Sequence, residues 1–390
     1  MMNFRQLSYA SVLLAAALGM PAAAKAEPPP LLLPSTSPVT PGAFYLSVGG
    51  FAAVHRSKGF EYGSLQTSSG ASFGPSRPLF KFGESITVGG GTATFGYALD
   101  KSDPLGGIGA APRIEFGFSL FRGSERDSSS PGGTCSVASC DFATLGKIGG
   151  AGTSGFGWLS VPPPVIPVGP NSGFFVDGRY RGRYWGGDGT LRYRTDFRVA
   201  PRFTISPSIG VLGGAQVFKH ELNINYRDEV TGTPIWDAQV QASLSSFHVG
   251  PDFGATVTFI ATPRFSVHGG VTLAILYRRA NLKGRDCGTA SGFPCPIVPG
   301  EANGFESSVD TSRSKLAFRV GLSAGATFKA RPWLHFTVIG FGSWDSAVPG
   351  VARNDTAIVN GNLVTSGPAR IVFSGNWSYG GALVMTIPFR

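Results

Sequence analysis

The sequence predicts an all-β chain that folds as a closed antiparallel up-and-down transmembrane β-barrel of about ten strands. Three observations support this prediction. The N-terminus resembles an export signal, apolar residues alternate with small or polar ones along most of the chain, and the connections between predicted strands alternate between short and long. No segment after the N-terminus has 18 consecutive apolar residues, which excludes membrane-spanning helices.

The composition agrees with a barrel. Charged residues make up 14% of the 390 residues, well below the roughly 25% of soluble globular domains. The chain also has 56 glycines and 42% hydrophobic residues. This balance excludes a disordered chain and is not typical of a soluble enzyme. Strands that place apolar residues toward lipid and small or polar residues toward a crowded interior would have such a composition.

The N-terminal segment predicts export. Arg5 precedes the short apolar run 9–20, and small residues at Ala24 and Ala26 suit a cleavage site. The run is too short for a bilayer, which needs about 20 residues. We therefore predict a signal peptide at 1–26, a Pro-rich periplasmic leader at 27–42 and the barrel at 43–390.

Alternation with period two is clearest between residues 190 and 342. In 190–199, Leu191, Tyr193, Phe197 and their odd-numbered neighbours form an apolar face, and charged residues form the other. Similar patterns elsewhere predict ten strands, with eight and twelve as the alternatives. They lie near 43–54, 85–99, 111–122, 189–199, 203–217, 244–260, 265–279, 314–328, 333–344 and 375–389.

The lengths of the connections predict that one end of the barrel has short turns and the other end has long loops. Short connections lie at 100–110, 200–202, 261–264 and 329–332. Long ones lie at 55–84, 123–188, 218–243, 280–313 and 345–374. A soluble sandwich has no reason to place every long loop at one end, whereas membrane barrels have short turns at one end and long loops at the other. We also expect two of the long loops to contain hairpins, one within 220–241 and one around Asn360-Gly361.

Four cysteines form two close pairs, each within a long loop. Cys135 pairs in the sequence with Cys140, and Cys287 with Cys295. Neither spacing is that of a zinc site, so in an oxidising compartment we predict two local disulfides and neither metal nor cofactor.

The inward face of the predicted strands carries most of the charge. The predicted lumen-lining residues are Arg113, Glu115, Arg192, Arg194, Asp196, Arg198, His248, Asp252, His268, Lys315 and Arg319. One hypothesis is a passage for small anionic solutes. The other is a set of paired charges that fills a narrow barrel. Eight strands enclose an interior that side chains just fill, whereas 16–18 strands leave a channel, so ten lies near the filled limit.

Motifs for other chemistry are weak. His248 and Asp252 share a face, but His268 is expected near a short turn, away from His248. The sequence has neither a nucleophile elbow nor an HExxH motif, so we predict no enzyme and no catalytic residue. Its glycine strings lack the phosphate-loop pattern, and its basic residues alternate along strands instead of clustering on a helix, so we expect no nucleic-acid partner.

The last predicted strand resembles the terminal strand of a known class of membrane barrels. The segment 377–389 (WSYGGALVMTIPF), with the turn and loop asymmetry, resembles the porin-like and OmpA-like outer-membrane barrels of Gram-negative bacteria over 43–390. That family usually ends on the aromatic residue, whereas here Arg390 follows Phe389. The resemblance implies a bacterial outer-membrane protein in contact with outer-membrane lipid and lipopolysaccharide. It also implies that the barrel-assembly machinery recognises the terminal strand.

Three functions remain as hypotheses. The first is a porin-like or structural barrel that forms at most a narrow channel for small hydrophilic solutes, including anions. The alternative is a surface-recognition protein or adhesin that acts through the loops 123–188, 218–243 and 280–313. The third is a protease or lipid-modifying enzyme at the barrel rim.

Overall fold

The structure is a computed structural model of the chain. It describes residues 42–69, 72–75, 77–99, 110–134, 139–144, 173–228, 234–290, 304–353, 356–359, 362–365 and 367–389. The predicted signal peptide and nearly all of the predicted leader lie outside these residues, so both stay predictions.

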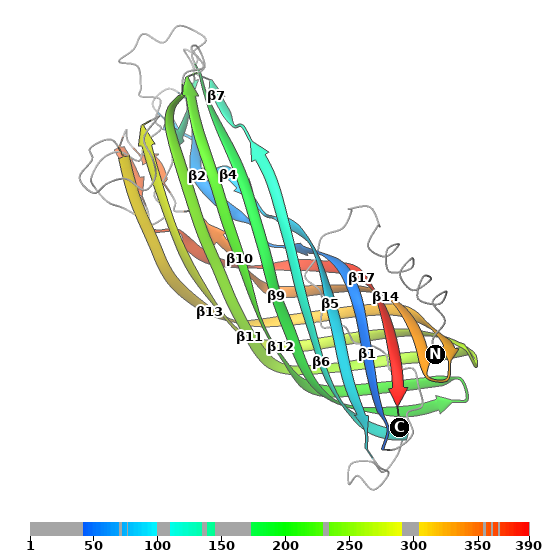
Figure 1. Cartoon of the computed structure of the whole chain (residues 1–390). Helices are drawn as coiled ribbons and strands as arrows, with labels where there is room; N and C mark the ends of the chain where they lie inside the picture. The colour runs from blue at the N-terminus through cyan, green and yellow to red at the C-terminus, as the bar shows by residue number, and fades with distance from the viewer. Residues whose placement is uncertain are drawn as a thin grey trace.

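Ten strands pair in a closed antiparallel ring (Figure 1). In ring order they are β1 (Phe44–Arg56), β5 (Ser85–Ala98), β6 (Ala110–Ser129), β9 (Gly173–Ala200), β10 (Phe203–Asp228), β11 (Pro234–Thr262), β12 (Phe265–Ala290), β13 (Gly304–Arg331), β14 (Leu334–Ala352) and β17 (Arg370–Phe389). The first strand pairs with the last from Phe44↔Phe389 to His55↔Ser378, which closes the sheet. Each of the ten predicted strands overlaps one of these.

Short turns join the strands at one end of the barrel, which we call the turn end. Pro201-Arg202, Pro263-Arg264 and Pro332-Trp333 connect β9 to β10, β11 to β12 and β13 to β14. These turns confirm the predicted connections 200–202, 261–264 and 329–332. The fourth, 100–110, falls almost entirely outside the described residues. The opposite end, where the long connections lie, we call the loop end.

Toward the loop end the strands are much longer than predicted. Strand β1 has 13 residues, whereas β9 has 28 and β11 has 29. Strands β9 to β13 therefore form a tall wall on one side of the barrel (Figure 1). The boundary predicted at residue 189 was wrong because the alternation continues upstream. Tyr180 and Tyr184 face inward and are buried, although both lie in the long connection predicted at 123–188.

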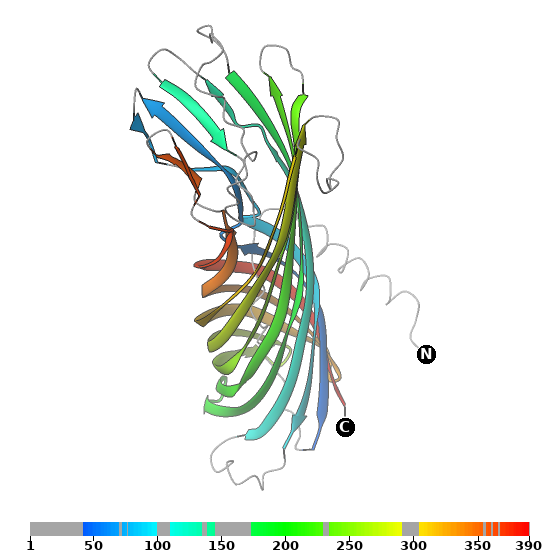
Figure 2. The same cartoon turned by 90° about the vertical axis from the view of Figure 1, so that its left-hand side faces the viewer.

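Shorter strands cover the inner side of the wall. They are β2 (Phe60–Ser69), β3 (Ser72–Phe73), β4 (Arg77–Phe82) and β8 (Ser139–Thr144). A further short strand, β7 (Gly132–Thr134), pairs with the end of β9 and extends the wall. Strand β2 pairs with β4 and β8 and touches β14 at Val351↔Phe60, so the sheet continues beyond the ring (Figure 2). Apolar residues of β2 and β4, including Phe60, Phe80 and Phe82, pack into one buried cluster with Leu222 and Val240 of the wall. We call this covered upper part the head.

The outer surface of the ring is an apolar belt. Leu120, Leu191, Leu322 and Val338 are exposed on it, as are many other large hydrophobic residues. Aromatic residues border the belt at the turn end, with Phe203, Phe259, Phe265, Phe328 and Trp333 exposed beside the turns. Exposed apolar surface on this scale is stable against lipid, and ring closure satisfies the backbone hydrogen bonds that lipid would leave unpaired. The fold is a closed transmembrane β-barrel.

The long connections contain the two predicted hairpins. Strands β10 and β11 stay paired up to Tyr226↔Trp236. Strands β15 (Thr356–Val359) and β16 (Asn362–Thr365) form a separate two-stranded sheet, although the Asn360-Gly361 turn itself is outside the described residues. Cys287 is disulfide-bonded. Its predicted partner Cys295 and the residue Cys135 are outside the described residues, so both pairings stay predictions. Among the described residues, no helix is long and apolar enough to cross a membrane.

Candidate functional site

The structure places most of the predicted lumen residues inside the ring. Eight are buried: Arg113, Glu115, Arg192, Arg194, His248, Asp252, His268 and Arg319. Asp196 is partly buried. Arg198 and Lys315 share the inward alternation but are exposed. Arg198 lies at the turn end, where it donates to the Pro201 carbonyl at 2.7 Å. Lys315 lies on β13 four residues beyond Arg319, the last residue that pairs with β14, so the ring does not enclose it.

A group of charges fills the lumen near the turn end. The Arg113 guanidinium spans two carboxylates, with Nε at 3.0 Å from Glu115 and Nη2 at 2.8 Å from Asp196. Tyr45 donates its hydroxyl hydrogen to Glu115 at 2.5 Å, and Arg194 lies 3.8 Å from the same carboxylate. These five residues, which we call the turn layer, come from β1, β6 and β9. They therefore connect three strands across the interior.

The middle of the lumen contains a buried Arg192–Asp252 ion pair between β9 and β11. Nearby, the His268 ring occupies space that Gly325 leaves free. A Cβ on Gly325 would lie 2.5 Å from His268 Nε2. Hydroxyl residues such as Thr256 and Thr272 occupy much of the rest of this level. The interior here is polar and closely packed.

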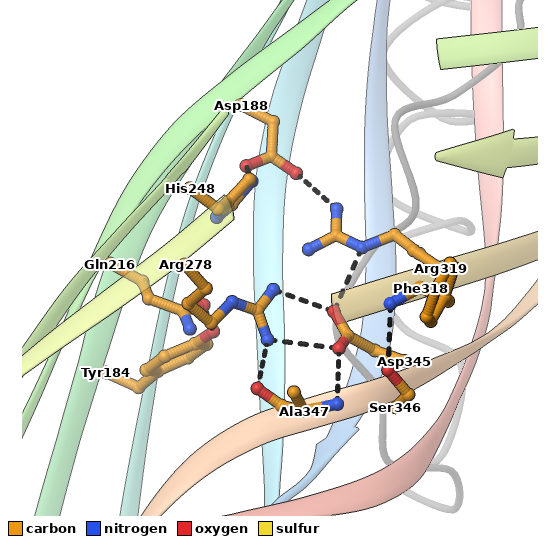
Figure 3. A network of polar contacts seen from close by, with 10 residues as sticks. All are labelled: Tyr184, Asp188, Gln216, His248, Arg278, Phe318, Arg319, Asp345, Ser346 and Ala347. Atoms are coloured by element: carbon orange, nitrogen blue, oxygen red, sulfur yellow. Dashed lines mark hydrogen bonds and ion pairs between the residues drawn. The ribbon is translucent and has the colours of Figure 1, made fainter. Parts of the chain in front are cut away.

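A second group of charges crosses the lumen toward the loop end (Figure 3). Asp345 accepts two hydrogen bonds from Arg278, at 2.7 and 3.0 Å, and one from Arg319 at 3.2 Å. Arg319 also reaches Asp188 at 3.2 Å, and Asp188 lies 3.1 Å from His248 Nε2. We call these five residues the upper network. Its members come from β9, β11, β12, β13 and β14, so half of the ring strands meet in it.

Three members of the upper network were not predicted from the sequence. Arg278 was overlooked, although the same alternation that places Tyr277 outside places it inside. Asp188 and Asp345 were assigned to loops because the predicted strands ended one residue too early. Extending the period-two pattern by one residue at each boundary would have found both.

Aromatic packing closes the lumen above the upper network. His220 Nδ1 is 2.8 Å from the Tyr180 hydroxyl. The His220 ring stacks on Phe60 with centroids 4.8 Å apart and lies tilted against Phe218 at 4.1 Å. Burial lowers the pKa of His220 to about 3, so the imidazole is neutral at ordinary pH. On β2, burial and then the Asp286 carboxylate raise the pKa of the Tyr62 hydroxyl.

The two charged groups have the properties of a filled interior. A water-filled passage would leave the side chains that line it accessible. Arg113 and Arg194 of the turn layer are 1% exposed, and Arg278 of the upper network is 0% exposed. Buried charges persist only when they are paired and hydrogen-bonded, as these are. Among the described residues, no group of three or more His, Cys, Asp or Glu side chains could hold a metal ion.

Comparisons with known proteins identify no relative by sequence. No family model matches the chain, and no curated protein matches it. Several solved bacterial outer-membrane proteins are similar in structure. The outer membrane protease OmpT from Escherichia coli has a TM-score of 0.37 and 10% identity, over 91% of this chain and 99% of that chain. An outer membrane channel from Pseudomonas putida F1 has a TM-score of 0.29 and 8% identity, over 92% and 100%.

The transport unit of the autotransporter AIDA-I from Escherichia coli is a third similar structure, with a TM-score of 0.24 and 10% identity over the whole of both chains. These three proteins differ in activity. Scores this low place the chain in none of their families and assign it no activity.

Proposed function

We propose that this protein is a bacterial outer-membrane barrel that stays closed to solutes and presents its folded head for recognition at the cell surface. The observation that carries this proposal is the burial of paired charges at two levels of the lumen, where only Asp196 is partly exposed. It favours the hypothesis of a filled barrel over that of an anion passage, and the surface-recognition alternative over a porin.

The energetics of the lumen support a closed state. A conducting pathway would have to separate the pairs around Asp345 and around Glu115. Removing one partner of a buried ion pair costs about 3–5 kcal/mol, because an uncompensated charge remains in the interior. The turn layer and the upper network lie at different heights in the lumen and join different sets of strands. A pathway through the barrel would therefore have to break the ion pairs at both levels.

The head supports the recognition part of the proposal. Strands β9 to β13 continue well beyond the apolar belt, and β2 and β4 complete a hydrophobic core there. A barrel that served only to span the membrane would not need this second core. Folded structure on the long-connection side would give loops a rigid support, and binding residues commonly lie on loops held by such a scaffold.

The Asp188–His248 contact is the arrangement that a catalytic general base uses. Both side chains are buried, and the head covers them on the loop side. We therefore assign the contact a structural role in the upper network. Replacing His248 with Gln keeps a hydrogen-bonding group there, and we expect the folded barrel to persist.

Planar-bilayer recordings test the closed lumen. The full chain is inserted into one bilayer, and an open 16-stranded porin is inserted into a separate bilayer as a positive control. Heat-modifiable migration verifies that the full chain is folded and inserted. We expect no conductance steps from the full chain. A steady ohmic conductance from the inserted protein would overturn the closed barrel and restore the channel hypothesis.

Recognition is tested with a variant in which the β10–β11 hairpin is shortened at the level of Leu222↔Val240. Bacteria that express either form at equal surface levels are compared in adhesion to epithelial monolayers, autoaggregation and phage adsorption. We expect the shortened form to lose at least one of these activities. Equal behaviour in all three would contradict the recognition role.

A further inference from the structure

The outer face of the tall wall carries a concentration of basic side chains just above the apolar belt. The outward positions of β6, β9 and β10 hold Arg122, Arg126, Arg179, Arg181, Arg183 and Lys219, which we call the basic wall. All six are exposed or half-buried. On the described part of this face, the acidic residues are Glu221, 3.4 Å from Arg183, and Asp177 at the far end. The surface therefore has an excess of positive charge.

Several of these charges are direct neighbours across strands. Arg126 of β6 lies opposite Arg181 of β9, and Arg183 of β9 lies opposite Lys219 of β10. Like charges in directly opposed positions destabilise a sheet. The repulsion between these like charges does not stabilise the fold, whereas a bound polyanion would neutralise it.

The acidic residues in the upper part of β6 lie on the opposite alternation from its arginines. Glu125 and Asp127 occupy the inward alternation of β6, and burial, followed by these two carboxylates, raises the pKa of the Tyr180 hydroxyl. Hence the upper part of β6 separates its charges, with its acids inward and Arg122 and Arg126 outward.

The basic wall adjoins the level at which the apolar belt ends. Leu120 is exposed in the belt, and Arg122 is the next outward residue on β6. Trp185 lies opposite both Arg122 and Val217, and Lys219 Nζ is 5.4 Å from the Trp185 ring centroid. Tryptophan at this level is typical of the interface between hydrocarbon and headgroups. The arginines would therefore lie at the height of lipid headgroups.

A shallow hollow continues this surface toward β12 and β13. It has a volume of about 560 Å³, and Lys219, Lys283 and Arg285 line it together with Glu221 and Asp310. Lys283 is paired with Asp310 at 3.4 Å, whereas Arg285 donates to the neutral Gln241 amide at 3.0 Å. The hollow could hold the polar part of a headgroup whose phosphates contact the basic wall.

We propose that the basic wall binds the phosphate groups of lipopolysaccharide in the outer leaflet. The planar guanidinium group donates two parallel hydrogen bonds to a phosphate, and several arginines at headgroup height match a multiply phosphorylated glycolipid. Basic clusters next to a membrane span are attracted to anionic lipid by the same electrostatics. The inference rests on the proposed placement in the outer membrane and names a lipid partner for it.

The test compares binding of the full-length folded protein to lipopolysaccharide with and without its phosphates. The protein in phosphatidylcholine nanodiscs is titrated with intact lipopolysaccharide and with chemically dephosphorylated lipopolysaccharide. We expect at least tenfold weaker binding to the dephosphorylated form, and weaker binding of the intact form as salt rises. Equal affinity for the two forms would overturn the proposal without use of any variant.

Matched variants localise the site. The wall variant carries Arg126→Ser, Arg181→Ser and Lys219→Ser. The control variant carries Arg202→Ser, Arg264→Ser and Arg331→Ser, which remove the same charge from exposed positions at the turn end. We expect at least tenfold weaker binding by the wall variant and less than a twofold change in the control. Equal losses would mean that net charge alone drives binding, and would overturn the assignment.

The two proposals fail separately. Absence of lipopolysaccharide binding by a barrel that is inserted, heat-modifiable and non-conducting would refute the basic wall but leave the closed barrel intact. Conductance together with phosphate-dependent binding would refute the closed barrel but leave the basic wall intact.

Discussion

Arg278 on β12 and Asp345 on β14 face each other across the barrel interior, although β13 separates their strands in the ring. Their side chains form two parallel hydrogen bonds of 3.0 and 2.7 Å, and the residues are 67 positions apart in the sequence. Arg278 also donates to the Ala347 carbonyl at 2.6 Å, so its guanidinium fork is held from two sides. The pair joins non-adjacent strands inside the ring, which backbone pairing alone cannot do.

We expect Asp345→Asn to destabilise the barrel strongly. The change leaves Arg278 and Arg319 buried without their shared carboxylate, and loss of one partner from a buried pair costs about 3–5 kcal/mol. Asp310→Asn is the control, since the Asp310–Lys283 pair is about 70% exposed and such pairs contribute about 0–1 kcal/mol. Urea unfolding in lipid vesicles measures both. Similar losses for the two variants would contradict the role of the upper network.

A second prediction concerns close packing around His268. In Gly325→Ala the new methyl group would overlap the His268 ring and the Val338 carbonyl oxygen, and such overpacking costs about 1–3 kcal/mol. Gly340→Ala is the matched control on the neighbouring strand, because its Cβ would lie 3.9 Å from the nearest atom. The fraction of heat-modifiable protein after refolding reports the difference. Normal refolding of Gly325→Ala would show that the lumen has spare volume.

The apolar belt predicts a dependence on depth. Val271 lies on the outer face of β12 midway between the exposed aromatic residues Phe265 and Tyr277, and Val199 lies next to a short turn. We expect Val271→Arg to cost about 2–4 kcal/mol of insertion free energy and Val199→Arg about 0–1 kcal/mol, because the cost of a lipid-facing arginine falls toward the interface. Insertion into vesicles at increasing urea measures both. A larger cost for Val199→Arg than for Val271→Arg would contradict the position assigned to the apolar belt.

His220 predicts loss of stability in acid. In the unfolded chain the imidazole binds a proton near pH 6.5, whereas burial lowers the folded pKa to about 3. The unfolded state therefore binds more protons between these values, and the stability present above pH 6.5 falls as the pH falls toward 3. Each pH unit in this window costs at most about 1.4 kcal/mol.

The variant His220→Phe keeps the stacked ring but removes the titration. Between pH 7 and pH 4.5, we expect the free energy of unfolding to fall by about 2 kcal/mol less in the variant than in the wild type. Urea titrations at the two pH values provide the comparison. Equal pH dependence in both proteins would show that His220 is not the buried neutral group.

The period-two pattern and the connection lengths predicted the barrel because both are local properties of the chain. Phe197, Phe203 and Phe265 reveal the turns and the belt without any knowledge of tertiary contacts. The head was not predictable in the same way. Glycines interrupt the alternation in 178–189. In β2 and β4, consecutive residues such as Ser64 with Leu65 and Leu79 with Phe80 are buried, so both faces are covered and no alternation marks these strands.

The same limit applies to the lumen. Alternation identifies Arg319 and Asp252 as inward residues, yet it does not reveal that Arg319 reaches Asp188 and Asp345, which are 131 and 26 residues away. Such contacts depend on ring closure and on the stagger between strands. Net charge on the inward face therefore suggested an anion passage, whereas the geometry pairs the charges with one another.

The unequal strand heights leave β13 with an unprotected flank. It is paired on both sides from Arg319 to Arg331, but among the described residues the part above Arg319 pairs along its length only with β12. A free strand edge can recruit a further strand from another chain. Arg313 and Lys315 are exposed on this part. Charged side chains of this kind discourage adventitious strand addition, so neighbouring molecules in one membrane would not join edge to edge.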